Sequence, residues 1–239
     1  MSMLCIATTQ FACSWDLGRN LDQAEQLVRQ AAAQGAQVIL LQELFATPYF
    51  CIEQDHKHLA LAEDFSPGDT GFRVWDTAYG RLGLGICWDQ WFPETARCLA
   101  LMGAEVLLFP TAIGSEPGAA ALDSRDHWQM AMRGHAAANI LPVIAANRVG
   151  REVASNDPEL AMSFYGSSFI SNHKGKLLAE ADRDSTGVLV QALDLAAMRE
   201  ERLTWGIYRD RRPEMYGPLL GLDGRQSHVR WAARGALDV

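Results

Sequence analysis

Apolar and polar positions along the chain predict strands and helices that follow one another in turn. Residues 4–9 form an apolar run of strand length, and residues 37–41 form a second one. Between them, apolar residues recur every three or four positions, which predicts a helix with Asn20 at its N-cap and Gly35 at its end. The chain is therefore expected to begin with a strand–helix–strand unit, and the alternation continues through the later residues.

The stretch 80–94 contains the sharpest change of pattern. An apolar run interrupted by glycines leads into Cys87, and Pro93, which is favoured in the first turn of a helix, follows shortly. This predicts a strand, a tight turn that carries Cys87, and a helix. Unpaired N–H groups and the dipole at a helix N-terminus lower the pKa of a nearby thiol and can bind an oxyanion.

A buried structural role is the commoner one for a cysteine. The polar and aromatic neighbours of Cys87, among them Trp88 and Asp89, are poor core partners and favour a functional site.

Two carboxylates follow predicted strands directly. Glu43 lies just beyond the run that ends at residue 41, where α/β folds tend to place reacting groups, and it is a candidate general base. Glu116 follows the apolar strand predicted over residues 105–109. For both residues an exposed loop carboxylate is the alternative interpretation.

Length and composition favour a single globular domain over residues 1–239, because 49% of the residues are hydrophobic and 21% are charged. The formal net charge of −8 and the pI near 5.2 disfavour nucleic acid or an anionic membrane as a partner. The same charge leaves room for a cationic small molecule.

Targeting and redox signals favour a cytoplasmic protein. The first residues lack the charged region and apolar run of a signal peptide, and no apolar stretch reaches membrane-spanning length. The five cysteines include no C-x-x-C pair, and their number is odd. Free thiols are therefore expected, rather than a disulfide framework or a zinc site.

Several short blocks match one family in its order along nearly the whole chain. They are Gln42-Glu-Leu-Phe45, Pro48-Tyr-Phe-Cys51, Pro67-Gly-Asp-Thr-Gly-Phe72, Cys87-Trp-Asp-Gln-Trp-Phe-Pro-Glu94, Pro110-Thr-Ala-Ile-Gly-Ser-Glu-Pro117, Gly134-His-Ala-Ala-Ala-Asn139, Phe164-Tyr-Gly-Ser-Ser-Phe-Ile170 and Arg209-Asp-Arg-Arg-Pro213. Any one block is weakly specific. Together they resemble the nitrilase (carbon–nitrogen hydrolase) superfamily, and within it the N-carbamoylputrescine amidohydrolases.

The resemblance implies an α/β fold, a nitrilase-like α-β-β-α sandwich, and a Glu–Lys–Cys triad that needs no metal or organic cofactor. Glu43 matches the family's base and Cys87 its nucleophile. In such a scheme the thiol attacks a carbamoyl carbon, the carboxylate moves the proton, and water releases the carbamoyl-enzyme. The backbone N–H of Trp88 would help to hold the oxyanion.

The chain departs from the family between Glu43 and Cys87. The family places its triad lysine there, in a segment of several tens of residues that this chain omits between residues 59–65 and 66–70. The lysines of this chain match no family motif: Lys57, Lys174 and Lys176. The omission predicts a sandwich that lacks some interior strands of one sheet, and it removes a charge-stabilising donor whose loss costs a factor on the order of 10²–10³ in rate.

The substrate implied by the resemblance is N-carbamoylputrescine, which yields putrescine, carbon dioxide and ammonia in polyamine biosynthesis. Its ammonium could meet Asp89 or Glu116, and Tyr49 or Trp88 could add an aromatic face. One alternative is an N-carbamoyl amino acid or another linear amide. Another is a non-catalytic relative that only binds ligand or oligomerises. Family members usually form dimers or larger assemblies, so we expect a homo-oligomer.

Overall fold

The computed structural model describes residues 3–53, 71–115 and 122–221. By its internal contacts the chain divides into a main unit, Met1–Arg202, and a second unit, Leu203–Val239. Each unit is described by itself. A single domain over residues 1–239 stays a prediction.

Three sheets form the framework of the main unit. The first has the strand order β12-β1-β2, in which β1 (Met3–Gln10) pairs antiparallel with β12 (Gly187–Asp194) and parallel with β2 (Val38–Leu40). The second sheet, in order, consists of β11 (Leu177–Glu180), β10 (Phe169–Ser171), β7 (Val143–Ala146), β5 (Val106–Pro110), β4 (Gly80–Leu84) and β3 (Val74–Thr77). The third consists of β6 (Gly114–Ser115), β9 (Ala161–Tyr165) and β8 (Val149–Val153).

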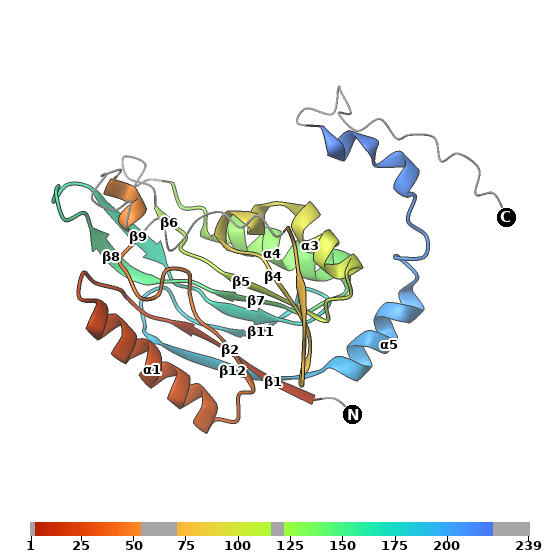
Figure 1. Ribbon diagram of the computed structural model, residues 1–239, viewed down its shortest axis with the longest axis horizontal. Coiled ribbons are helices and arrows are strands. Elements are labelled where there is room, and N and C mark those ends of the chain that lie inside the picture. Colours follow the sequence, from red (N-terminus) through yellow and green to blue (C-terminus); the bar gives the residue numbers. More distant parts are fainter. Residues whose placement is uncertain (1–2, 54–70, 116–121, 222–239) are drawn as a thin grey trace. The chain divides into compact units, whose positions relative to one another are not determined.

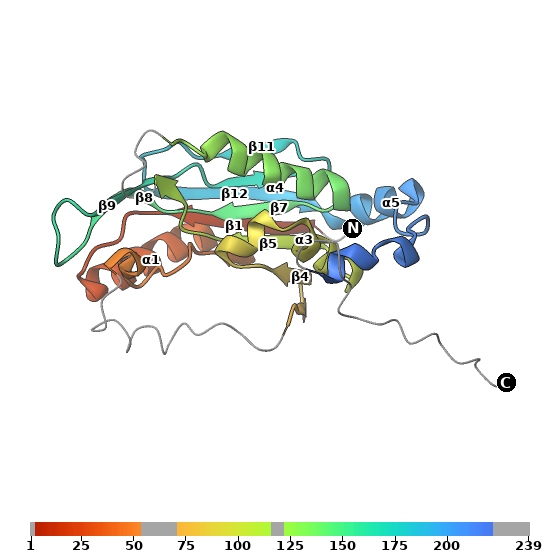
Figure 2. The same ribbon diagram turned by 90° about the horizontal axis from the view of Figure 1, so that it is seen from above.

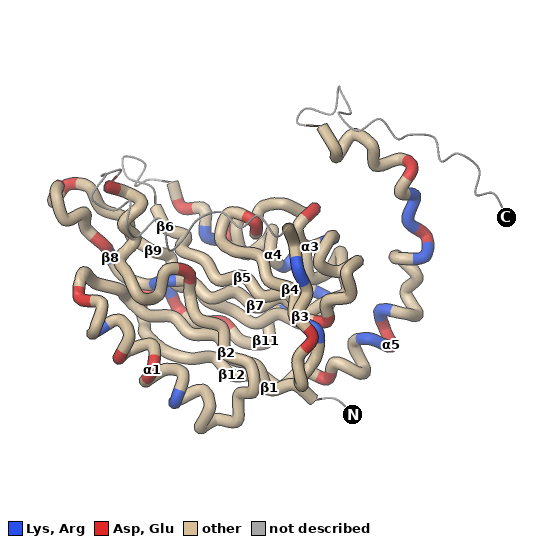
Figure 3. Tube along the Cα trace, viewed as in Figure 1, with Lys and Arg blue, Asp and Glu red and all other residues tan. Residues whose placement is uncertain are grey.

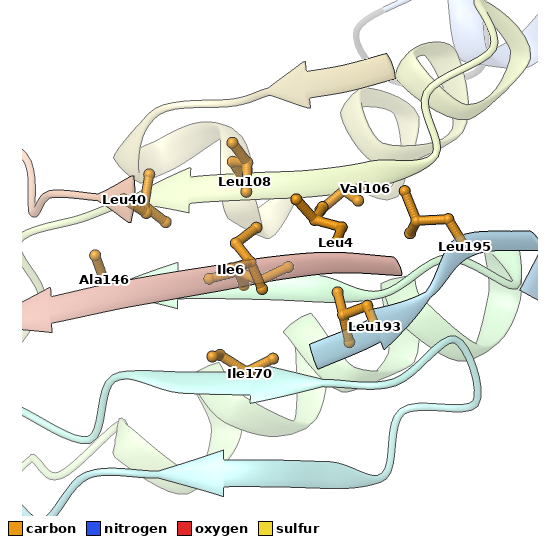
Figure 4. Packing of buried hydrophobic residues seen from close by; sticks show 10 residues of the cluster. Leu4, Ile6, Leu40, Val106, Leu108, Ala146, Ile170, Leu193 and Leu195 are labelled. Carbon is orange, nitrogen blue, oxygen red and sulfur yellow. The ribbon is translucent and has the colours of Figure 1, made fainter. Parts of the chain in front are cut away.

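The first two sheets pack face to face, with helices on both outer faces (Figures 1 and 2). Helix α1 (Leu17–Ala33) covers the first sheet, and α3 (Pro93–Leu101) and α4 (Arg125–Asn139) cover the second. The core between the sheets is apolar (Figure 4), and its buried residues are Leu4, Ile6, Leu40, Val106, Leu108, Ile144, Ala146, Ile170, Leu193 and Leu195. The layers are those of the predicted α-β-β-α sandwich.

The two facing sheets differ in size. In the described ranges the first sheet has three strands and ends at β2, whereas the second has six. Leu82 and Leu84 on β4 are accordingly only partly buried against the core. This inequality agrees with the expectation that one sheet lacks strands, and it leaves an edge at β2.

The predicted strand–helix–strand start is confirmed, but the predicted cap of the helix is wrong. Asp16 is the N-cap of α1, because its carboxylate accepts the Arg19 N–H at 3.0 Å. Asn20 is buried, and its amide donates to the carbonyls of Ser14 at 2.7 Å and Ala46 at 3.1 Å. The side chain therefore ties α1 to the turn that follows β2.

Charged residues are sparse in the central strands, and residues of both signs lie along α1 and α5 (Leu195–Trp205) (Figure 3). None of the helices in the described ranges is both long enough and apolar enough to cross a membrane.

The described part of the second unit includes two short 3₁₀ turns, Pro213–Met215 and Gly217–Leu220. Several of its large apolar side chains are exposed: Leu203, Trp205, Met215, Tyr216, Leu219 and Leu220. These side chains therefore contribute little hydrophobic stabilisation within their own unit.

The sheet–sheet core predicts a large effect for one truncation. Ile144→Ala should lower the free energy of unfolding by about 2–5 kcal/mol, because it removes a fully buried side chain and leaves a cavity. Urea denaturation measures the loss. Leu21→Ala on the exposed face of α1 is the matched control, and equal losses in the two variants would contradict the packing described here.

Candidate active site

Cys87 is presented by a strained turn between β4 and α3. It opens a 3₁₀ helix, Cys87–Trp91, and its φ of +46° lies in the left-handed region, which costs a non-glycine residue about 1–3 kcal/mol. The carboxylate of Asp89 accepts the Ile86 N–H at 3.0 Å and holds the turn closed. The predicted strand, turn and helix are confirmed, and the 3₁₀ helix between them was not foreseen.

The side chain and backbone of Gln90 anchor this turn to the second sheet and to α4. Its amide nitrogen donates to Thr111 Oγ1 at 2.9 Å, and its amide oxygen accepts the indole N–H of Trp128 at 2.6 Å. The Gln90 carbonyl also lies 2.8 Å from Nε2 of His135. All four side chains are buried, so the turn below Cys87 is fixed by a satisfied polar network.

Glu43 lies in the turn that follows β2, and the next residue, Leu44, also has a positive φ of 51°. The preceding Gln42 is buried and bonds the backbone of Phe11 in both directions, at 2.9 and 2.8 Å. These bonds fix the chain just before Glu43 to Phe11, the residue that follows β1.

The Glu43 carboxyl and the Cys87 thiol form a hydrogen bond with each other. The backbone of Ala112, just beyond β5, hydrogen-bonds to both groups, and the Thr111 side chain also reaches Cys87. Two residues separated by more than forty positions in the sequence are thus brought into contact. The sequence had proposed both as reacting groups.

The electrostatics of Cys87 differ from expectation. Burial first, and then the charge of Glu43 and its hydrogen bond, raise the pKa of the Cys87 thiol from 9.0 to about 12, against smaller lowering effects of Ala112 and Thr111. The predicted lowering of this pKa is therefore wrong. A short 3₁₀ turn offers too little stabilisation to outweigh desolvation and a neighbouring carboxylate.

Glu43 is also held in a desolvating environment. Burial raises the pKa of its carboxyl, while the hydrogen bond from Cys87, the charge of Arg148 and the Ala112 backbone act in the opposite direction. Its Oε2 atom is buried and has no hydrogen-bond partner in the described part of the chain. Two ionised groups would repel each other here, so the pair favours a neutral thiol.

The residues proposed for substrate contact have different surroundings. Trp88 is 69% exposed, and its ring lies 6.4 Å from that of Trp91. The ring of Tyr49 packs edge-to-face on Phe164 at 5.7 Å. The carboxylate of Asp89 already accepts a bond within its own turn. Glu116 lies outside the described residues. Contact of these four residues with substrate stays a prediction.

The lysines that the structure describes lie away from this pair. Lys174 forms an ion pair with Glu201 at 2.5 Å, and Lys176 is exposed in the same turn between β10 and β11. Lys57 lies outside the described residues. The cation whose charge acts on Glu43 is instead Arg148, which is fully buried. The hydrophobic pattern could not distinguish this arginine from an exposed one.

Comparison with known proteins gives a consistent result. The model of the carbon–nitrogen hydrolase family matches residues 5–65 and 60–202. The N-carbamoylputrescine amidase of Arabidopsis thaliana is 40% identical over 92% of this chain and 96% of its own length. The citrullinase of Francisella tularensis is 38% identical over 92% and 99%. The crystal structure of a carbon–nitrogen hydrolase from Helicobacter pylori superposes with a TM-score of 0.85 at 29% identity, over 92% and 99% of the two chains.

These matches also locate the omitted segment. The two stretches matched by the family model meet at residues 60–65. The alignment with the Arabidopsis protein extends over 286 positions, more than the 239 residues of this chain. The relative therefore has residues without a counterpart here, as the sequence predicted. The structural match confirms the nitrilase-type sandwich.

The raised pKa of Cys87 predicts a specific dependence of stability on pH. Folding keeps this thiol protonated, so its contribution to stability is complete below about pH 9 and is lost as the pH rises toward 12. Cys87→Ser should flatten the decline of unfolding free energy over this window, as measured by urea denaturation. Cys98→Ser, at an exposed position, should leave the decline unchanged. A slope that Cys87→Ser does not alter would contradict the assignment.

Proposed function

Because the chain belongs to the carbon–nitrogen hydrolase family, a family of amidohydrolases, we propose that Glu43 and Cys87 are its catalytic base and nucleophile. The observation that carries this proposal is the hydrogen bond between the two side chains at the ends of β2 and β4. A base within hydrogen-bond reach of a nucleophile is the arrangement that covalent catalysis requires.

The reaction begins with a neutral thiol, since the pKa of Cys87 is about 12. Glu43 takes the thiol proton as Sγ attacks the carbamoyl carbon, and the backbone N–H of Trp88 helps to hold the oxyanion. Glu43 then returns the proton to the departing nitrogen, which leaves a carbamoyl group on sulfur. Water attacks this group with Glu43 again as base, and the resulting carbamic acid breaks down to carbon dioxide and the remaining amine or ammonia.

The chain is expected to work slowly. No lysine in the described residues contacts the Glu43–Cys87 pair, so the developing negative charge lacks a donor that the family supplies. One such donor is worth a factor on the order of 10²–10³ in rate. The raised pKa of Cys87 lowers the reactivity of its thiol further, because in the described ranges no ammonium acts on it to favour the thiolate.

N-carbamoylputrescine is the proposed substrate. The name of the Arabidopsis relative and the net charge of −8 both support a cationic carbamoyl amine. Tyr49, Trp88, Asp89 and Glu116 are proposed to surround its ammonium-bearing end. The Francisella citrullinase supports the alternative of a carbamoyl amino acid. A substrate carboxylate would need a cation, however, and Arg148 already pairs with Glu152.

We also propose a cytoplasmic homo-oligomer. The five cysteines are free thiols, which suits a reducing compartment. The exposed apolar side chains of residues 203–220 favour burial against another copy of the chain.

Turnover of N-carbamoylputrescine tests the reaction. Ammonia release should be measurable but about 10²–10³-fold slower than that of the Arabidopsis enzyme assayed beside it. Glu43→Gln and Cys87→Ser should each reduce it to background, whereas Cys98→Ser should not change it. Turnover that survives Cys87→Ser would contradict the proposed nucleophile. Complete inactivity of a folded wild-type chain would favour the non-catalytic alternative.

Substitution of the two carboxylates tests the substrate. Asp89→Asn and Glu116→Gln should raise KM for N-carbamoylputrescine, because each removes a negative charge proposed to face its ammonium. The same variants should leave KM for citrulline unchanged or lower it. Initial rates over a range of both substrates measure the effect. An unchanged KM for N-carbamoylputrescine in both variants would refute these contacts.

A further inference from the structure

A buried ion pair lies behind the turn that carries Glu43. Arg148 connects β7 to β8, Glu152 lies on β8, and their side chains are 0% and 5% exposed. Arg148 Nε and Glu152 Oε1 are 3.1 Å apart. Removing two charges from water is costly, so a buried ion pair often adds little net stability. The role of this pair is therefore inferred from the groups that its two side chains contact.

The two partners hold the same segment at two points. Arg148 Nη2 donates to the carbonyl of Thr47 at 2.5 Å, and Glu152 Oε2 accepts the N–H of Tyr49 at 2.6 Å. Thr47 in turn donates its N–H to the carbonyl of Leu44, the residue that follows Glu43, at 3.0 Å. The chain from Leu44 to Tyr49 is thus fixed by one positive side chain just before β8 and one negative side chain on β8.

The guanidinium is itself held in place. It lies over the ring of Phe164, 5.3 Å from the ring centre, on β9, which pairs with β8. Its charge acts on Glu43 and favours the carboxylate form. The other groups that interact electrostatically with Glu43 in the described residues are the thiols of Cys87 and Cys51 and the Ala112 backbone. Arg148 is the cation among these groups.

We propose that the Arg148–Glu152 pair is a positioning device for the active site, which fixes the turn that bears Glu43 and keeps a positive charge behind its carboxylate. The inference rests on the proposed role of Glu43 as the base. Neither Arg148 nor Glu152 touches the reacting atoms. Each acts through Glu43, so the effect is expected in the ionisation of that carboxyl and in the reactivity of Cys87, and not in stability alone.

The test is the pH dependence of Cys87 alkylation by iodoacetamide, followed by peptide mass spectrometry in the full-length chain. The acid limb of this curve, where the alkylation rate rises with pH, reports the ionisation of Glu43, the base that takes the thiol proton. Arg148→Met should move this limb to higher pH by about one unit, the low end of the ~1–3 units that an adjacent arginine exerts. The sign follows because loss of the guanidinium disfavours the carboxylate.

Two further variants separate charge from hydrogen bonding. Arg148→Lys keeps the charge and should retain the acid limb, with a several-fold slower plateau because the bond to Thr47 is lost. Glu152→Gln keeps an acceptor for Tyr49 and removes a negative charge, so the limb should stay or move to lower pH. Arg151→Met, which removes an exposed charge from the same strand, is the matched control and should match the wild type.

The outcomes are distinguishable. If Glu43→Gln shows the same pH profile as the wild type, the proposed base fails and the inference fails with it. If the profile depends on Glu43 but Arg148→Met coincides with Arg151→Met, the inference alone is overturned. Should Arg148→Met not fold by circular dichroism, Arg148→Lys and Glu152→Gln decide. If Arg148→Lys reaches the same maximum alkylation rate as the wild type, the inference is overturned. It is also overturned if the acid limb of Glu152→Gln moves to higher pH.

Discussion

The hydrogen bond between the buried Glu43 carboxyl and the Cys87 thiol is the interaction on which the active site depends. It places two groups of the same charge type in one desolvated position, where they cannot both ionise. Burial therefore keeps the thiol neutral, and within the described part of the chain the Glu43 carboxyl is the acidic group that hydrogen-bonds to it. The proposed chemistry therefore begins with proton transfer to Glu43 during attack, and not with a preformed thiolate.

The fold delivers both groups to this position from different sheets. Glu43 follows β2 of the first sheet, and Cys87 follows β4 of the second, each in a turn with a residue of positive φ. Strain of this kind persists only where the surroundings determine the backbone. Gln42 and Gln90 supply that support through buried hydrogen bonds on the two sides, which makes both turns part of the rigid framework.

The sequence predicted the start of the fold and the turn at Cys87, and it singled out the two residues that the fold brings together, because strand ends and apolar periodicity are local patterns. It also predicted the omitted segment, since motif order reveals a gap. The pKa of Cys87 was predicted in the wrong direction, because its burial and its contact with Glu43 depend on chain segments far apart. For the same reason the local pattern indicates Asn20 as the cap where Asp16 has that role, and it does not distinguish Arg148 as a buried cation.

The most direct test of covalent catalysis is mass spectrometry of the chain quenched during turnover of N-carbamoylputrescine. We expect a carbamoyl group on the peptide that contains Cys87, and no such group on the other cysteines or in Cys87→Ser. The adduct should accumulate further if release by water is slow. Product formation without any adduct on Cys87, or with an adduct on a different residue, would contradict the account.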